Sequence, residues 1–426
     1  MRRFFYSLIA RYVGLYVRPE DSIVELDPSG PELLSHFAQG RAVEGAAGAE
    51  GGGDLDADYV VVNGRLHYER DIQAYLDRIR AAMRPESRLI VIYHSMLWKP
   101  LISVATRLGW RLRTAEVNWL SNDDILNLLH LADFEPIRRD PKILFPVPIP
   151  FLAALFNRYL APLPGFSALC MVNIAVARPR PTAPRGAPSV SVVVPARNEA
   201  GNIESLVARL PAMGPQDELI FVEGGSTDET WSNVLEAQGR ASGRQPILAT
   251  RQKGKGKGDA VRTGFAMASR DILMILDADL TVPPEDLPKF YAAIVQGKGE
   301  FVNGSRLVYP MERHAMRFAN LIGNKFFATA FSFVLGQRFK DTLCGTKALS
   351  RENYLRLAQH RAYFGDFDPF GDFDLIFGAA RMGLRIVEVP IRYRERTYGQ
   401  TNISRWRHGA ILLRMLIFAA FRLRFI

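Results

Sequence analysis

The second half of the chain alternates short apolar runs with segments of helical periodicity. Apolar runs at 191–194, 218–222 and 272–276 are each followed by polar and glycine residues. Runs that are apolar throughout are typical of strands buried on both faces, and strands that alternate with helices are typical of parallel sheets. We therefore predict an α/β domain with a mainly parallel sheet. A phenylalanine-rich helix is expected at 315–335. Most of its phenylalanines are expected to pack in the core, although some could line a groove for a lipid chain.

The first half has an α/β pattern of its own. Strands are predicted at 22–26, 58–62 and 88–92, and a helix at 69–83. The span between the first two strands is short and contains a glycine-rich run at 45–53. We therefore predict a truncated Rossmann-like domain that lacks at least one strand–helix unit.

A proline-rich segment separates the two halves. Residues 177–188 contain four prolines, which forbid a helix or a central strand there. We predict an N-terminal domain at 1–178, a linker at 179–188, a second domain at 189–404 and a C-terminal tail at 405–426.

Two aspartates follow the apolar run at 272–276. Positions i and i+2 of an extended chain point the same way, so Asp277 and Asp279 are predicted to face one cation together. Two carboxylates, with the other positions left to water and phosphate, suit Mg²⁺ or Mn²⁺ holding a diphosphate. The chemistry implied is departure of a nucleoside diphosphate, with the metal neutralising its charge. The pair alone is weak evidence for a metal site, because most such pairs lie in surface turns.

Three further polar clusters accompany the predicted strands. They are Pro195–Glu199, Glu223–Asp228 and Gly256–Ala260, the last opening a helix with Lys257 between two glycines. In open α/β sheets, ligands bind at the carboxyl ends of the strands. Four such clusters in one sheet predict a ligand site rather than a coincidence.

The order of these motifs resembles family-two glycosyltransferases with the glycosyltransferase-A fold. The nearest branch is the group of dolichol-phosphate mannose synthases and polyprenyl-phosphate glycosyltransferases. The resemblance covers about residues 189–409, including Asp341–Lys347 and Arg394–Asn402. It implies a metal-dependent, inverting transfer of a sugar from a GDP- or UDP-linked donor to a lipid phosphate in cell-envelope glycan synthesis. One departure is Glu223-Gly224-Gly225-Ser226, where the family often has Asp-Asp-Gly-Ser, so the base and the sugar stay open.

The resemblance also assigns roles to particular residues. It implies that Asp277 and Asp279 hold the metal. The predicted nucleotide-binding residues are Pro195, Arg197, Glu199, Glu223, Lys257 and Asp277.

The acceptor decides which further residues are needed. A lipid phosphate is already an anion near neutral pH and needs cations rather than a strong base. Arginine suits this role because its planar fork matches phosphate oxygens. The candidates are Arg306, Lys347, Arg394 and Arg396.

A hydroxyl acceptor would instead require a carboxylate base. Asp341, Asp372 and Asp374 are the candidates, and Asp372 could equally be a helix N-cap. With Arg306, the residues Asp341 and Asp372 form the predicted catalytic set.

The net charge of +10 is concentrated at the C-terminal end. From Ile391 onwards there are eight arginines and one acid, Glu395, which gives +7. No nucleic-acid motif accompanies this excess, and apolar residues interleave it, so we expect contact with an anionic membrane surface rather than with nucleic acid. The alternatives are a solvated helix face, packing on the tail's own domain, or a dimer contact. No apolar run reaches the ~18 residues of a spanning helix.

The strands of the first half resemble the later part of class I methyltransferases that use S-adenosylmethionine. In that family a strand ending in an acid, here Glu25, leads into a Gly-x-Gly-x-Gly turn under the cofactor. The turn reads Asp27-Pro28-Ser29-Gly30-Pro31 in this chain, which obstructs close approach of a ligand to the backbone. We predict a degenerate domain to which S-adenosylmethionine does not bind.

The remaining expectations concern the compartment and the class of protein. Cys170 and Cys344 lie far apart, which is consistent with a reducing compartment. The N-terminal segment is basic and then apolar but is interrupted by Arg11, so a helix is favoured over a signal peptide. We expect a peripheral enzyme on the inner face of the plasma membrane. The sequence leaves open whether it forms homo-oligomers. A bifunctional methyltransferase and glycosyltransferase or a non-catalytic scaffold are the alternatives.

Overall fold

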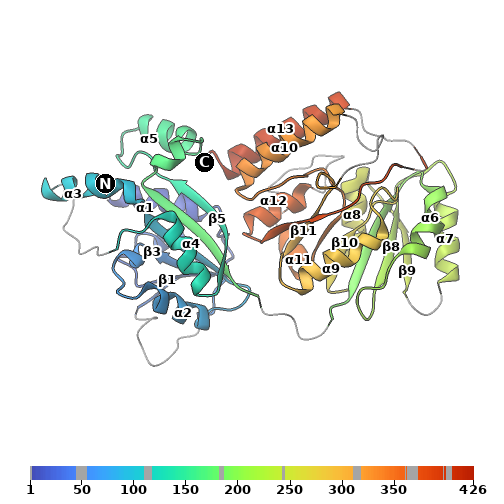
Figure 1. Ribbon diagram of the computed structural model, residues 1–426, viewed down its shortest axis with the longest axis horizontal. Helices are drawn as coiled ribbons and strands as arrows, with labels where there is room; N and C mark the ends of the chain where they lie inside the picture. The colour runs from blue at the N-terminus through green and yellow to red at the C-terminus, as the bar shows by residue number, and fades with distance from the viewer. Residues whose placement is uncertain are drawn as a thin grey trace. The chain divides into compact units, whose positions relative to one another are not determined.

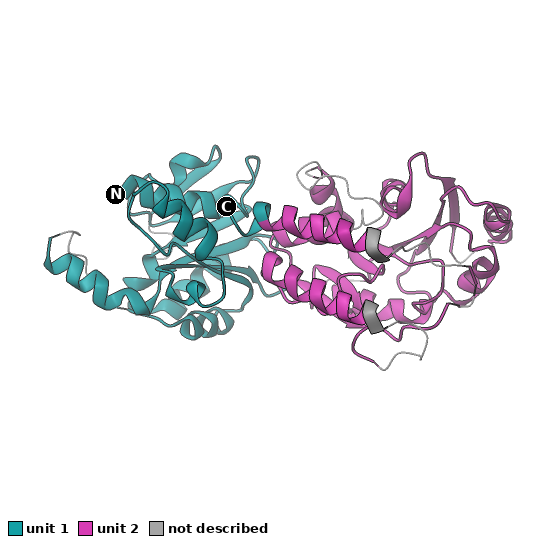
Figure 2. Cartoon of the chain, turned by 90° about the horizontal axis from the view of Figure 1, so that it is seen from above, with its two compact units in different colours: residues 1–181, 421–426 teal, residues 182–420 magenta. Residues whose placement is uncertain are grey.

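The chain divides into two compact units, which are residues 1–181 with 421–426, and residues 182–420 (Figure 2). The computed structural model describes residues 2–44, 55–109, 118–181, 187–241, 245–309, 318–359, 361, 373–396, 398–399 and 405–426, with the backbone alone at 318–320 and 405–407. Each unit is an α/β structure built on one sheet (Figure 1). The predicted α/β class with two mainly parallel sheets is therefore confirmed.

Unit 1 contains a six-stranded sheet in the order β2-β1-β3-β4-β6-β5. The first four strands are parallel, whereas β6 runs antiparallel to both β4 and β5. The strands are β1 (Ile23–Leu26), β2 (Gly40–Val43), β3 (Tyr59–Asn63), β4 (Arg88–His94), β5 (Phe134–Lys142) and β6 (Val172–Pro179). The helices are α1 (Arg2–Val13), η1 (Leu34–His36), η2 (Arg65–His67), α2 (Ile72–Ala82), η3 (Met96–Trp98), α3 (Lys99–Arg107), α4 (Asn122–Leu131), α5 (Leu152–Ala154), η4 (Leu155–Leu160) and η5 (Phe166–Leu169).

Alternate residues of the central strands of unit 1 enter two different cores. Val60 and Val62 of β3 pack with α2 and α4, which cover one face of the sheet. Tyr59 and Val61 pack with α1 on the other face. Because side chains alternate along a strand, a run that is apolar throughout needs a cover on both faces, and these helices supply it.

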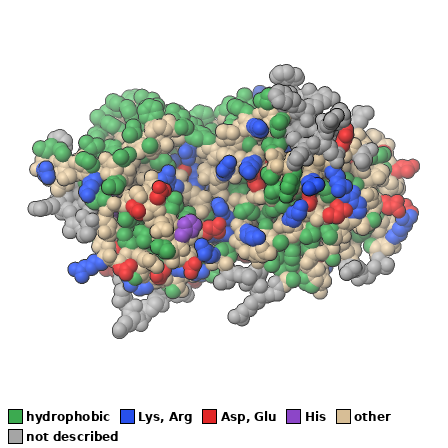
Figure 3. All heavy atoms as spheres, viewed as in Figure 1, with side chains coloured by type: hydrophobic (Ala, Val, Ile, Leu, Met, Phe, Trp, Pro, Cys, Tyr) green, Lys and Arg blue, Asp and Glu red, His purple; other side chains and the backbone are tan. Residues whose placement is uncertain are grey.

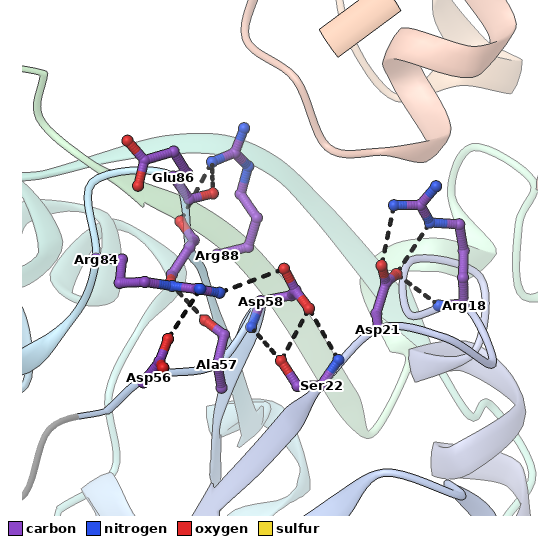
Figure 4. A network of polar contacts seen from close by, with 10 residues as sticks. Arg18, Asp21, Ser22, Asp56, Ala57, Asp58, Arg84, Glu86 and Arg88 are labelled. Atoms are coloured by element: carbon purple, nitrogen blue, oxygen red, sulfur yellow. Dashed lines mark hydrogen bonds and ion pairs between the residues drawn. The ribbon is translucent and has the colours of Figure 1, made fainter. Parts of the chain in front are cut away.

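A polar network joins the beginnings of β1 and β3 (Figure 4). Asp58 Oδ2 accepts hydrogen bonds from the backbone N–H of Ser22 at 2.9 Å and from its hydroxyl at 2.8 Å. Arg84 adds ion pairs with Asp56 at 2.8 Å and with Asp58 at 3.3 Å. These contacts hold the strands in register at the end of the sheet opposite their carboxyl ends.

Unit 2 contains a seven-stranded sheet in the order β13-β11-β12-β10-β7-β8-β9, in which only β12 is antiparallel to its neighbours among the described strands. The strands are β7 (Val190–Ala196), β8 (Glu218–Glu223), β9 (Ile247–Arg251), β10 (Ile272–Ile275), β11 (Phe301–Ser305), β12 (Lys347–Ser350) and β13 (Ile386–Pro390). The helices are η6 (Ala200–Asn202), α6 (Ile203–Arg209), α7 (Thr230–Arg240), α8 (Gly256–Met267), η7 (Pro284–Asp286), α9 (Leu287–Val295), α10 (Phe318–Leu335), α11 (Arg351–Ala358), α12 (Phe373–Arg381) and α13 (Arg405–Leu423).

Helices cover both faces of the unit 2 sheet. Residues of α6, α7 and α9 share a core with Val190, Val192 and Val194 of β7. On the other face α8 lies so close to β7 and β8 that a Cβ added at Gly264 would overlap Val193. Phe265 of α8 then packs edge-on against Tyr354 of α11, with ring centroids 4.8 Å apart.

Helix α13 covers the segment that the sequence predicts to be a membrane-surface tail. Leu412, Met415 and Ala419 are buried, whereas Leu413 and Ile417 are about half exposed. One side of this helix therefore packs on protein. In the described residues, none of the helices combines the length and the apolar character needed to span a bilayer.

Candidate active site

The strand order of the unit 2 sheet reverses between β7 and β10. From β7 the chain proceeds to β8 and β9 on one side, and then returns to place β10 on the other side of β7. At such a switch point the loops after the two strands diverge and leave a crevice at the carboxyl ends. Residues after β7, β8 and β10 therefore surround one location, as the sequence predicts.

Asp277 is held by a lysine and backed by a glycine. Lys257, in the first turn of α8, places its Nζ 2.5 Å from Asp277 Oδ1. A Cβ added at Gly345 would overlap both Asp277 Oδ2 and Lys257 Nζ. The pair is about a quarter exposed, so it forms a charged wall of the crevice with no room for a side chain behind it.

Asp279 lies in a turn rather than in an extended continuation of β10. The strand ends at Ile275, and Leu280 after the turn has a φ of +54°. Asp279 Oδ1 accepts hydrogen bonds from the backbone N–H of Thr281 at 3.1 Å and from its hydroxyl at 2.7 Å. The extended geometry assumed for the two aspartates is thus replaced by a turn that the Asp279 carboxylate itself stabilises.

A single arginine bridges the ends of β7 and β10. Arg396 donates from Nη2 to Asp279 Oδ2 at 2.6 Å and from Nη1 to Glu199 Oε1 at 2.9 Å. Asn202 donates to the other oxygen of Glu199 at 2.7 Å. Burial raises the pKa of Glu199 to about 7 despite the opposing effects of Arg396 and Asn202.

Glu223, at the end of β8, is buried and tied to its own turn. One carboxylate oxygen accepts a hydrogen bond from the backbone N–H of Ser226, and the other lies 3.5 Å from Arg251 Nε. Arg251 in turn lies over the ring of Trp231, 4.7 Å from its centroid. Arg251 and Trp231 present a cation and an aromatic face beside the Glu223 turn.

The loops after β7 and β8 are joined directly. Asn198, with a φ of +56°, accepts a hydrogen bond from the backbone N–H of Thr227 at 2.8 Å, and its own N–H donates to the Ser226 hydroxyl at 3.0 Å. An asparagine tolerates the left-handed conformation better than most residues. The two loops therefore form one wall.

Residues after β13 lie against this wall. The backbone N–H of Arg394 donates to Thr281 O at 2.9 Å. The Tyr398 hydroxyl donates to Asp228 at 3.3 Å, and a Cβ added at Gly201 would press on the Tyr398 ring. This segment delivers Arg396 to the crevice.

Arg306 and Asp341 form a buried pair. Arg306 donates to the two Asp341 oxygens from Nε at 2.6 Å and from Nη2 at 2.8 Å, and Asn324 donates to Oδ1 at 3.0 Å. Burial opposes ionisation of Asp341, but Arg306 outweighs it and holds the pKa of that carboxyl below its ordinary value. Asp341 is fully buried, and its contacts are those of a residue that positions Arg306.

The other predicted residues differ in accessibility. Lys347 is fully buried on β12 and donates to Cys344 O at 2.5 Å, whereas Arg197 and Arg394 are exposed and Pro195 is half-buried. Asp374 pairs with Arg361 at 2.8 Å. Asp372 lies outside the described residues.

The chemistry available at the crevice is that of three carboxylates, Glu199, Asp277 and Asp279, paired with two cations, Lys257 and Arg396. Among the described residues no group of three or more acids, histidines or cysteines converges on a point that could hold a metal. Asp277 and Asp279 supply hard oxygen donors and keep some exposure, so a divalent cation that draws its remaining ligands from phosphate and water fits these side chains.

Several residues that contact the acids and loops of this site were not predicted from the sequence. Thr281, Tyr398, Trp231 and Gly345 have no charged group that would mark them out. Gly345 and Tyr398 do lie inside the motifs used for the family resemblance, which is the signal that could have found them.

Comparison with known families gives one match in the second unit. Residues 191–356 match the model of Glycosyl transferase family 2.

Three relatives align with about half of the chain or less. Glycosyltransferase AglJ of Haloferax volcanii is 30% identical over 226 residues, which are 53% of this chain and 69% of the relative. Dolichol-phosphate mannosyltransferase of Pyrococcus furiosus is 38% identical over 122 residues, or 28% and 33% of the two chains. Undecaprenyl-phosphate 4-deoxy-4-formamido-L-arabinose transferase of Edwardsiella ictaluri is 28% identical over 219 residues, or 50% and 62%. The chain spans less than two thirds of the last two relatives.

A solved structure is similar at a lower level. The crystal structure of glucosyl-3-phosphoglycerate synthase from Mycobacterium tuberculosis with Mn²⁺, UDP and glucosyl-3-phosphoglycerate is 23% identical over 55% of this chain and 80% of that chain, with a TM-score of 0.39.

Proposed function

Because the chain belongs to glycosyl transferase family 2, we propose that it transfers a sugar from a nucleotide sugar to a polyprenyl-type lipid phosphate. The observation that carries this proposal is the convergence of Glu199, Asp277 and Asp279 with Lys257 and Arg396 at the switch point of the sheet. Acids and cations placed together in one crevice suit a ligand that carries both a polyol and a diphosphate. The glycosyltransferase-A fold is the architecture that accompanies this proposal.

The donor would lie at the carboxyl ends of β7, β8 and β10. Glu199 and Glu223 are at the ends of neighbouring parallel strands, where carboxylates can accept hydrogen bonds from ribose or base. Arg251 and Trp231 add a stacked surface beside Glu223. Glu199 titrates near neutral pH, so its protonation would affect how well it accepts those bonds.

A divalent cation would be held by Asp277 and Asp279. When bound, such an ion neutralises charge on the departing nucleoside diphosphate. The two cationic side chains that contact these aspartates, Lys257 and Arg396, are then close enough to interact with the diphosphate instead. Charge at this point of the crevice is therefore balanced by protein groups before any ligand binds.

The acceptor is proposed to be a lipid phosphate because both aligned polyprenyl-phosphate relatives carry that acceptor in their names. A phosphate oxygen is an anionic nucleophile and requires orientation more than deprotonation. Arg394 is exposed and Arg396 partly so, and both lie on the segment after β13. A hydroxyl acceptor would need a free carboxylate base, whereas Asp341 is buried in its pair with Arg306.

The N-terminal unit is proposed to be methyltransferase-like but unable to bind S-adenosylmethionine. The beginning of helix α1 lies at the carboxyl ends of the strands: Arg2 donates to Ser29 O at 3.0 Å and pairs with Glu32 at 2.8 Å. Phe5 of the same helix stacks on His94 at the end of β4, with ring centroids 6.4 Å apart. In an open α/β sheet this is the end at which a ligand would bind.

The proposal is tested by incubating the full chain with a panel of GDP- and UDP-sugars, Mn²⁺ or Mg²⁺, and a short polyprenyl phosphate in detergent. The expected result is release of nucleoside diphosphate that depends on both the cation and the lipid phosphate, with a sugar–phosphate–lipid product. Product formed only with a hydroxyl acceptor would contradict the lipid-phosphate assignment. Absence of release from every donor would favour a non-catalytic role.

We propose that the enzyme is located at the inner face of the plasma membrane, where such acceptors meet cytoplasmic donors.

A further inference from the structure

Helix α3 of unit 1 has an apolar side that faces away from the protein. None of its residues is buried. Leu101 and Val104 are 58% and 50% exposed, Leu108 just after the helix is 56% exposed, and Leu97 just before it is 63% exposed. Positions 97, 101, 104 and 108 recur with the spacing of one face of a helix, so they form a continuous stripe.

A second segment with exposed apolar side chains, residues 149–169, is joined to the beginning of this stripe. Trp98 Nε1 donates to Leu169 O at 2.8 Å, which joins the beginning of α3 to the end of η5. Between residues 149 and 169 the chain exposes Phe151 at 90% and Leu155 at 50%. Figure 3 shows hydrophobic side chains gathered over α5, which lies in this segment. We refer to Leu97, Leu101, Val104, Leu108, Phe151 and Leu155 as the apolar face of unit 1.

The extent of this face sets it apart from ordinary surface leucines. Single exposed apolar residues are normal, but a stripe along one helix, with more exposed apolar residues on a segment joined to its beginning, marks a surface that contacts a partner. Phe151 has a φ of +60°, a conformation that is unfavourable for a residue with a side chain, and its ring is directed to solvent. Neither the unfavourable backbone conformation nor the exposed ring of Phe151 contributes to the core of unit 1.

Charge identifies the partner. The segment 95–109 contains Lys99 and Arg107 and no acid, and the segment 143–171 contains Arg158 and no acid. A surface that combines an apolar stripe, basic residues and no carboxylate is complementary to an anionic lipid bilayer. A second copy of the chain fits less well, because a symmetric contact would bring together two surfaces that both carry basic residues and no acid.

We infer that the apolar face of unit 1 docks on an anionic membrane, with α3 lying in the plane of the bilayer surface. Its leucines and valine would enter the boundary of the acyl chains, and Lys99 and Arg107 would lie among the headgroups. The role of the N-terminal unit is then to hold the enzyme at the surface where its acceptor is found. This purpose rests on the proposed function, but the docking itself can be measured without any activity.

The first test measures binding of the full chain to vesicles of phosphatidylcholine with or without phosphatidylglycerol. Leu101→Glu combined with Val104→Glu should weaken binding to the anionic vesicles by about tenfold or more, because it places two acids in the stripe. The matched control is Leu235→Glu on α7, where a leucine of unit 2 is 42% exposed, and it should change binding by less than about twofold. Equal binding of the double variant and the wild type would overturn the inference.

The second test reports on contact directly. Cys170 and Cys344 are both buried at 1% exposure, so an environment-sensitive dye should label an introduced Leu101→Cys selectively. Its emission should shift to the blue with anionic vesicles, and the same dye at Leu235→Cys should not respond. A shift that follows protein concentration instead of lipid would assign the face to a contact between copies and overturn the membrane assignment.

Two further measurements separate this inference from the proposed function and from α13. Transfer to a detergent-dispersed lipid phosphate should be the same in the Leu101→Glu/Val104→Glu variant and the wild type. If the wild type is inactive there but the double variant still loses vesicle binding, the proposed function fails and the docking surface stands. Leu413→Glu with Ile417→Glu on α13 measures the contribution of the C-terminal helix, and the loss caused by the α3 variant should persist in that background.

Discussion

At the residue scale, the acids at the carboxyl edge of the unit 2 sheet are distinguished by their neighbours. Asp277 contacts a lysine, Asp279 contacts an arginine and a threonine, and Glu199 shares that arginine. Substitution of each acid is therefore expected to have a different effect on the enzyme.

Asp279→Asn should reduce sugar transfer by about a hundredfold or more, because an amide has neither the charge nor the donor strength to hold a divalent cation. The fold should persist, since the amide oxygen can still accept from Thr281. Steady-state rates at several Mn²⁺ concentrations provide the measurement. Asp271→Asn, at the opposite end of β10, is the control and should leave turnover near the wild-type value. Wild-type metal dependence in Asp279→Asn would exclude it as a ligand.

Gly345→Ala should impair the enzyme although it adds only one methyl group. The new Cβ would overlap Asp277 Oδ2 and Lys257 Nζ, so the pair would have to separate. We expect a loss of about tenfold or more in kcat/KM for the donor. Gly239→Ala on α7 is the matched control, because a Cβ there meets no atom within 4 Å and should slightly stabilise the helix. Equal kinetics for the two variants would place Gly345 outside the site.

Glu199→Gln should change how stability depends on pH. The folded-state pKa of about 7 is higher than the ordinary 4.5, so between these values the folded chain holds a proton that the unfolded chain releases. This contribution to the free energy of unfolding is complete below the lower value and is lost as pH rises through the higher one. The wild type should therefore lose about 3 kcal/mol relative to Glu199→Gln across this range. Urea unfolding at about pH 4.5 and pH 8 measures it, with Glu236→Gln on the surface as control. Parallel curves would show that Glu199 is not perturbed.

At the scale of elements, the sequence identifies what is buried on two sides and misses what is irregular. The apolar runs at 191–194, 218–222 and 272–276 correspond to β7, β8 and β10. By contrast, β12 begins with a buried lysine, and β5 contains two prolines and several charges, so neither has the pattern of a buried strand. Their places depend on tertiary pairing, which periodicity does not encode.

The candidate site was predictable to the same degree. The positions of the acids follow from strand ends and from the family resemblance. The partner of each acid does not, because Arg396 and Tyr398 come from a segment well over a hundred residues further along the chain. The turn at Asp279 was also not predictable, since the extended spacing of two residues gives no sign of the Thr281 hydrogen bonds.

Strand β5 supports a buried charge cluster that should be sensitive to substitution. Asp140 is fully buried and contacts Arg138 at 2.7 Å and Arg424 at 2.8 Å, and it also accepts a hydrogen bond from Tyr16. Burial lowers the pKa of the neighbouring Lys142 to about 8.

Asp140→Asn should cost about 3–5 kcal/mol of folding free energy, because it leaves buried cations without their counter-ion. Chemical denaturation of the full chain measures this loss. Arg424→Met should cost less, since Asp140 keeps Arg138 and Tyr16. If Arg424→Met proves the more damaging of the two, the cluster is not organised around Asp140.

At the scale of the whole molecule, the full chain should not bind S-adenosylmethionine at physiological concentrations. At the end of the unit 1 sheet where it would bind, Arg2 and Phe5 of α1 contact Ser29 and His94. Asp27, at the first position of the turn after β1, has a φ of +46°, which a glycine would adopt at lower cost. Calorimetric titration should show no saturable heat, with S-adenosylhomocysteine as a second ligand. Saturable binding would instead indicate a divergent but working cofactor site.

The assignment of residues 421–426 to unit 1 has a consequence for the order in which the protein is made. These residues leave the ribosome only after all of residues 182–420 have been synthesised, yet Arg424 pairs with Asp140 and Ile426 packs on the core that contains α1. Most of unit 1 is thus translated before unit 2, but unit 1 is completed only after unit 2 has been made. Until then a nascent unit 1 has one cation fewer around Asp140 and a gap in its apolar core, so chaperones and proteases can act on it for as long as unit 2 takes to be translated.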